Sequence, residues 1–264
     1  MSSRTAQALD KNDPELEAAG GTTHPAGPSP VTSDSAEPDP AKPDHTKPDL
    51  GKPGLGKPGL LVMDVDATLI REEVIDLLGD AAGAGERIAA ITARAMRGEL
   101  DFSQSLRARV RLLRGLPVSV FDDVFARVHV TPGALDLIAT LHAHGWKVGV
   151  VSGGFHEIVD RLADHLGLDH WIANRLEVSH GALTGGVLGD IVTKETKREA
   201  LERWMREDGL EPGQSVAVGD GANDIPMIRQ AALGIAFCAK PVVREHADHS
   251  ITTPDLMQVM TLLS

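Results

Sequence analysis

Cysteine, aromatic side chains and long apolar runs are scarce in this sequence of 264 residues. The single cysteine, Cys238, excludes an internal disulfide and suits a reducing cytoplasm. No apolar run approaches the roughly 18 residues of a membrane span, and residues 1–20 contain no apolar core of a secretion signal. We therefore expect a cytoplasmic protein without a membrane partner.

Basic residues are also in deficit. The chain has 26 Lys and Arg against 38 Asp and Glu, which gives a formal net charge of −12. Because this charge repels the phosphate backbone of nucleic acids, we expect no nucleic-acid partner.

Residues 1–57 differ in composition from the rest of the chain. They hold nine of the 16 prolines, and no Phe or Trp precedes Phe102. A repeat, AKPDH-TKPDL-GKPGL-GKPGL, closes the segment and is typical of an extended spacer. The segment has too little apolar surface for its burial to offset the conformational entropy lost on folding. The composition therefore predicts a disordered tail over 1–57.

The rest of the chain is organised around one stretch, Leu60-Leu61-Val62-Met63-Asp64-Val65-Asp66. Four consecutive apolar residues predict a short buried strand. Two aspartates follow where the strand leaves its sheet, and in open α/β sheets that edge binds ligands. Two carboxylates so close together repel each other unless a cation or a proton lies between them.

Strands and helices alternate after this stretch. Further short strands are predicted at 147–152, 216–218 and 234–237, with a hairpin within 176–192. Thr131-Pro132-Gly133 predicts a helix start with Thr131 as N-cap. The pattern favours an α/β fold with a doubly wound parallel sheet. Its core comprises 58–74 and 130–264, and the helical pattern over 75–129 predicts a small cap inserted after the first strand.

Three of the predicted strands end in polar residues that meet at one edge of a parallel sheet. These residues are Asp64 and Asp66, Ser152 and Gly153, and Asp220 and Asp224. Carboxylates of this kind suit Mg²⁺. Asp64 can attack a phosphorus atom, and Asp66 can protonate the leaving oxygen and then activate water. The Ser152 hydroxyl and the Gly153 N–H can bind phosphate oxygens at a helix start.

The motifs DVDATL, VVSGG, a helix lysine and GDGANDIPM, in this order, resemble those of the haloacid dehalogenase superfamily. The segments MRGELDFSQSLRARVRLL, ANRL and IAFCAKP extend the similarity to its phosphoserine phosphatases over 60–250. The resemblance implies hydrolysis of phosphoserine to serine, the last step of serine biosynthesis, through an aspartyl phosphate. The implied roles are Asp64 as nucleophile, Asp66 as acid and base, and Mg²⁺ on Asp64, the Asp66 carbonyl, Asp220 and Asp224.

The resemblance also implies a set of substrate-binding residues. These are Glu73 for the substrate amine, Arg109 for its carboxylate, and Ser152, Gly153, Lys197 and Asn223 for phosphate. Lys194 is the other candidate for the phosphate-binding lysine. We prefer Lys197 because the segment KREAL, which begins at Lys197, matches the helix that follows the family's lysine. Arg107 competes with Arg109 from a different helix face. Taken alone, Glu73 and Arg109 each fit a solvated helix charge better than a binding residue, by roughly two to one.

Other functions stay open at this point. A phosphotransferase of the same fold would pass the phosphoryl group to another alcohol, such as homoserine. A non-catalytic binder ranks last, because Asp64 and Asp66 are both present. Ala67 replaces a serine that is common in the family, and the tail offers no regulatory domain for feedback by serine. We leave open whether the chain forms a homodimer.

Overall fold

The structure, a computed structural model, describes residues 50–263. A seven-stranded sheet in the order β4-β3-β2-β1-β5-β6-β7 forms its centre. All neighbouring strands are parallel except β3 and β4, which form an antiparallel hairpin. The strands are β1 Leu60–Met63, β2 Lys147–Phe155, β3 His170–Ser179, β4 Ala182–Leu188, β5 Ser215–Gly219, β6 Leu233–Phe237 and β7 His249–Ile251. The predicted α/β class with its parallel sheet is confirmed.

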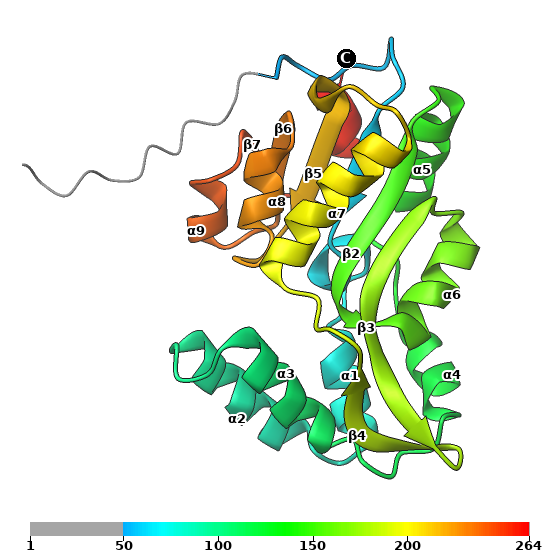
Figure 1. Ribbon diagram of the computed structural model, residues 1–264, viewed down its shortest axis with the longest axis vertical. Helices are drawn as coiled ribbons and strands as arrows, with labels where there is room; N and C mark the ends of the chain where they lie inside the picture. The colour runs from blue at the N-terminus through cyan, green and yellow to red at the C-terminus, as the bar shows by residue number, and fades with distance from the viewer. Residues whose placement is uncertain (1–49, 264) are drawn as a thin grey trace, which may run out of the picture. The chain divides into compact units, whose positions relative to one another are not determined.

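Helices cover both faces of the sheet (Figure 1). Helices α5 Ala134–Ala143 and α6 His156–Leu166 pack on one face, and α7 Lys194–Glu207 and α8 Ile225–Gln230 pack on the other. Side chains of β1 alternate between the two layers, since Leu61 and Met63 join the first and Leu60 and Val62 the second. This double burial explains the unbroken apolar run of the first strand.

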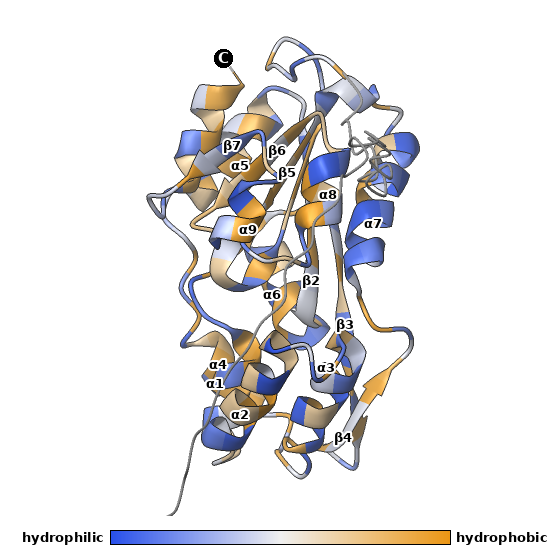
Figure 2. Ribbon diagram, turned by 90° about the vertical axis from the view of Figure 1, so that its left-hand side faces the viewer, coloured by the Kyte–Doolittle hydropathy of each residue, from blue (hydrophilic) through white to orange (hydrophobic). Residues whose placement is uncertain are grey.

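Polar residues cover the outer side of α7 (Figure 2). The blue, hydrophilic side of α7 contrasts with the orange of the central strands. The inner side of α7 carries Ala200, Leu201 and Trp204, all buried. No helix among the described residues is long and apolar enough to cross a membrane.

Between β1 and α5, four α-helices follow a short helical turn at Val65–Leu69. They are α1 Val74–Ala81, α2 Gly85–Met96, α3 Phe102–Arg111 and α4 Val120–Phe125. Helix α3 packs on α2 and on β4, so the hairpin of the sheet reaches this helical insertion. A bridge between Ile70 and Val130 joins the two chain segments that enter and leave it.

Two local predictions differ from the structure. Thr131 is not the N-cap of α5, because Gly133 occupies that position with a φ of 77°. The Thr131 hydroxyl instead donates to the Thr68 carbonyl at 2.7 Å, which ties the start of α5 to the turn after β1. Ser152 and Gly153 do not lie at a helix start, since β2 continues to Phe155 before α6 begins.

Most of the predicted tail, residues 1–49, lies outside the described residues. Its last part, residues 50–57, runs along the segment before β5. The Gly54 N–H donates to the Gln214 side-chain oxygen at 2.9 Å, and Lys57 pairs with Glu211 at 3.0 Å. Leu55 packs against the apolar core. These contacts attach the end of the segment to the sheet domain.

Candidate active site

The turn after β1 directs two aspartates in different directions. Asp64 is buried, and its carboxylate accepts the Val65 N–H at 2.7 Å. Ala67 then adopts a φ of 54°, which reverses the chain inside the short helical turn at Val65–Leu69. The Asp66 carboxylate accepts the Val74 N–H at 3.3 Å, at the start of α1. A backbone that turns so tightly can present two carboxylates to one ligand from different sides.

A buried lysine joins two of the strand ends. The Lys197 ammonium lies 2.7 Å from a carboxylate oxygen of Asp64 and 2.7 Å from one of Asp224. Only 1% of its side chain is exposed. Lys194, the competing candidate, is exposed and pairs with Glu195. Of the two lysines, the structure therefore brings Lys197 to the predicted site.

Three carboxylates converge beside this lysine. Asp64, Asp220 and Asp224 each place an oxygen within 4.8 Å of the others, so together they could hold a metal ion. A cluster made only of carboxylate oxygens suits a hard divalent cation. The carboxylate of Asp66 is not part of this group. Of the four residues predicted for the metal, three thus meet through their side chains.

Burial dominates the electrostatics of these acids. Desolvation and the charge of Asp224 raise the pKa of Asp64 well above its ordinary value, while Lys197 opposes the shift. Desolvation and the nearby Glu73 raise the pKa of Asp66 to about 7. Burial also raises the pKa of Asp220, again with help from Asp224. A carboxyl group with a pKa near neutrality can both give and take a proton at physiological pH.

The irregular end of β2 at residues 152–155, here termed the β2 loop, lies beside Asp66. The Gly154 N–H donates to the Ser152 hydroxyl oxygen at 2.8 Å, which leaves the hydroxyl hydrogen free for another acceptor. A Cβ atom at Gly154 would lie 2.8 Å from an Asp66 carboxylate oxygen and 3.0 Å from the Ser152 hydroxyl. Only glycine at this position lets the β2 loop approach Asp66 so closely.

Asn174 of β3, to which the sequence assigned no role, holds this loop in place. Its side-chain amide donates to the Gly153 carbonyl at 2.8 Å, and its oxygen accepts the Val192 N–H at 2.9 Å. The residue is fully buried. One side chain thereby connects the β2 loop to the segment that leads into α7. A buried asparagine inside a strand, in the ANRL segment, was the available signal.

A cavity of about 210 Å³ opens above these strand ends. It is lined by Asp64, Asp66, Glu73, Phe102, Arg109, Gly153, Asp220, Asn223 and Lys240, among others. Glu73 and Arg109 thus reach the same space as the catalytic candidates. Arg107 lines a different cavity, between α3 and β4. Lys240 was not anticipated from the sequence.

The environments of Glu73 and Arg109 fit a binding role. Desolvation of its carboxylate beside the cavity raises the pKa of Glu73, although the residue as a whole is exposed. Arg109 is half-buried, and its Nε donates weakly to the Ser105 carbonyl at 3.4 Å. Both charges therefore keep hydrogen-bonding capacity for a ligand.

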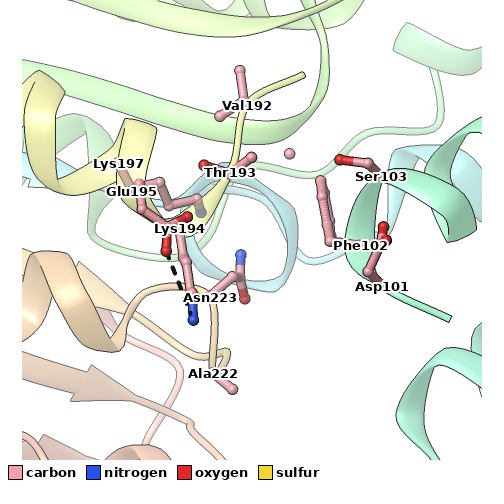
Figure 3. Close-up of a pocket in the computed structure, with 11 residues that line it drawn as sticks. Asp101, Phe102, Ser103, Val192, Thr193, Lys194, Glu195, Lys197, Ala222 and Asn223 are labelled. Carbon is pink, nitrogen blue, oxygen red and sulfur yellow. Dashed lines mark ion pairs between the residues drawn. The ribbon is translucent and has the colours of Figure 1, made fainter. Parts of the chain in front are cut away.

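A larger cavity of about 550 Å³ adjoins this one. Phe102, Gly153 and Asn223 line both cavities. Figure 3 shows Phe102 and Ser103 of α3 on one side of the larger space, across from Thr193 and Asn223. The acids predicted for catalysis line the smaller cavity, which we take as the reaction site.

The chain is similar to known proteins. A family model described as haloacid dehalogenase-like hydrolase matches residues 61–229. The chain is 59% identical over 204 residues to the phosphoserine phosphatase of Streptococcus thermophilus, covering 77% of this chain and 95% of that protein. It is 44% identical over 201 residues to the phosphoserine phosphatase of Methanocaldococcus jannaschii, covering 76% and 95%.

Solved structures of phosphoserine phosphatases have the same fold as this chain. A phospho-aspartyl intermediate analogue of phosphoserine phosphatase matches with a TM-score of 0.74 and 43% identity, covering 79% of this chain and all of that one. A substrate-bound phosphoserine phosphatase complex matches with the same TM-score and identity, covering 79% and 99%. The chain belongs to the haloacid dehalogenase-like hydrolases and, within them, to the phosphoserine phosphatase family.

Proposed function

We propose that this protein hydrolyses O-phospho-L-serine to L-serine and phosphate through an aspartyl-phosphate intermediate. The observation that carries the proposal is one cavity that combines the two acids after β1 with the Glu73 carboxylate, which directly precedes α1, and the Arg109 guanidinium of α3. A phosphorylated amino acid needs a phosphate site together with one anion and one cation for its charged end. The similarity to named phosphoserine phosphatases supports the same substrate.

The reaction begins with Asp64. Its carboxylate oxygen attacks phosphorus, the bond from phosphorus to the serine oxygen breaks, and Asp66 protonates that oxygen. Water then attacks the phosphorus of the acyl phosphate while Asp66 takes a proton from it, and the bond from phosphorus to the Asp64 oxygen breaks, which releases phosphate and restores the Asp64 carboxylate. The raised pKa of Asp66 suits both steps, since the group is partly protonated near neutral pH.

Four groups would bind the phosphate. The Ser152 hydroxyl is buried next to the cavity lining and retains a hydrogen to donate, and Gly153 and Asn223 line the cavity itself. Lys197 adds positive charge behind Asp64 and keeps its carboxylate oriented. These donors would stabilise the charge that spreads over the phosphoryl oxygens during transfer.

Asp64, Asp220 and Asp224 would hold Mg²⁺, with the Asp66 backbone carbonyl as a further ligand. The group of three carboxylates fits a hard cation with oxygen ligands. When bound, the ion would supply positive charge that offsets the repulsion between the carboxylates and the phosphate dianion.

At the other end of the cavity, Glu73 would bind the substrate amine and Arg109 its carboxylate. We take residues 75–129 as the cap that carries Arg109, and the cytoplasm as the location. Whether the protein forms a homodimer stays an open prediction that sedimentation would test.

The function is tested by phosphate release from phosphoserine and phosphoethanolamine, an ester without a carboxylate. Arg109→Ala should lower kcat/KM for phosphoserine by roughly 10- to 150-fold, the effect of losing a hydrogen bond to a charged group. The loss should shrink for phosphoethanolamine, whereas Glu73→Ala should impair both amine-bearing esters. Asp64→Asn should abolish turnover and the phosphoenzyme. Equal losses on both esters for Arg109→Ala would contradict the assigned specificity.

A further inference from the structure

Lys240 lines the reaction cavity without an assigned task. It follows β6, whose carboxyl end lies at the same edge of the sheet as those of β1 and β5. The residue is exposed, and no ion pair or side-chain hydrogen bond involving it occurs within residues 50–263. Its ammonium group is therefore available to a ligand.

The backbone around Lys240 is held firmly. Cys238 adopts a φ of 46°, unusual for a residue with a side chain, and its N–H donates to the Ile251 carbonyl at 2.7 Å. The Arg244 side chain donates to the Ala239 carbonyl at 2.7 Å. The Lys240 carbonyl accepts the Val243 N–H at the start of α9 Pro241–Arg244. The fold thus fixes where this lysine leaves the main chain and leaves its side chain free.

The charged residues that line the cavity indicate a role for Lys240. Four acids line it, Asp64, Asp66, Glu73 and Asp220, against two cations, Arg109 and Lys240. Lys197 lies behind, between Asp64 and Asp224. Without Lys240, the negative charge of these acids would exceed that of Arg109 and the Mg²⁺ proposed above, and a doubly charged phosphate ester would meet that excess at the opening. Lys240 also opposes the upward pKa shifts that burial causes in Glu73 and Asp220, so its field reaches both.

We propose that Lys240 recruits the anionic ester, offsetting the negative charge of the cavity as the phosphate enters. The inference rests on the proposed function and adds a residue to it. An exposed ammonium without a fixed partner acts through its field, which raises the rate of encounter and falls with ionic strength. It should act on any phosphate dianion, unlike Arg109, which is proposed for the carboxylate.

Kinetics of four proteins test the proposal: wild type, Lys240→Met, Lys240→Arg and the control Lys57→Met, which removes an exposed lysine on the segment before β1. Each is assayed with phosphoserine and phosphoethanolamine at low and high ionic strength. Lys240→Met should lower kcat/KM for both esters by about 3- to 10-fold at low salt, through KM, with kcat preserved. The loss should shrink at high salt. Lys240→Arg and Lys57→Met should match wild type.

Three results would overturn the proposal. Wild-type kinetics for Lys240→Met at low salt would remove any role. A loss confined to phosphoserine would make Lys240 a direct carboxylate contact, and a loss in kcat alone would place it in the chemistry or the fold. If wild type failed to hydrolyse phosphoserine, the proposed function would fall by itself, and p-nitrophenyl phosphate would still decide the role of Lys240.

Discussion

The raised pKa of Asp66 predicts how the stability of the protein depends on pH when divalent ions are chelated. Burial and Glu73 raise this pKa from 3.8 to about 7. The folded protein therefore keeps a proton that the unfolded chain has lost, so the stabilisation is complete below the unfolded pKa and disappears as pH rises through the folded one. Between about pH 6 and pH 8, this group alone should lower the free energy of unfolding by about 1.4 kcal/mol.

Urea unfolding in EDTA at several pH values measures this effect. Asp66→Asn keeps the shape and the acceptor for the Val74 N–H but cannot titrate, so its stability should fall less with pH than that of wild type. The difference between the two curves isolates Asp66 from histidines and other acids, which both proteins share. Asp136→Asn, on the exposed side of α5, should follow the wild-type curve. Parallel curves for wild type and Asp66→Asn would refute the reasoning.

Three further predictions concern single contacts. Lys197→Met leaves two buried carboxylates without their cation and should lower the free energy of unfolding by about 3–5 kcal/mol in urea titrations, so a change within experimental error would contradict the pairing. Gly154→Ala should displace the Asp66 carboxylate and lower kcat by roughly 10²-fold with a nearly unchanged melting temperature, and normal turnover would show that the loop yields freely. Deleting residues 1–57 removes the Gly54 partner of the buried Gln214 and should destabilise the protein by about 1–3 kcal/mol relative to deletion of 1–49, a difference that calorimetry on the two truncations can measure.

The sequence predicted the sheet and its functional edge because both leave strong local patterns. Apolar runs followed at once by Asp64, Ser152 or Asp220 have few structural explanations. The choice of Lys197 over Lys194 rested on family resemblance, but the helical pattern of the sequence also places Lys197 on the buried side of α7. Lys197 lies on the side of α7 that buries Ala200 and Leu201, as the 3.6-residue period requires.

Other features depend on contacts that no local pattern records. Thr131 precedes Pro132 and Gly133, a sequence typical of a helix N-cap. Its hydroxyl instead donates to the Thr68 carbonyl, which comes from a distant part of the chain. The strand β7 comprises three residues and sits at an edge, so its periodicity is too short to detect. Lys240 is an exposed lysine between β6 and α9, and its proposed role is visible only once the fold places it in the same cavity as the acids.

The buried ion pairs of Lys197 also bear on how the protein is made. Asp64 leaves the ribosome long before Lys197, and Asp224 follows later still. Until Lys197 has been synthesised, pairing β1 with its neighbours in the sheet would bury the Asp64 carboxylate without its cation, at a cost of several kcal/mol. A nascent chain that ends before α7 should therefore remain open at this edge, and a chaperone has that interval in which to hold it. The lysine that pairs with Asp64 therefore delays completion of the sheet until the last third of the polypeptide has been made.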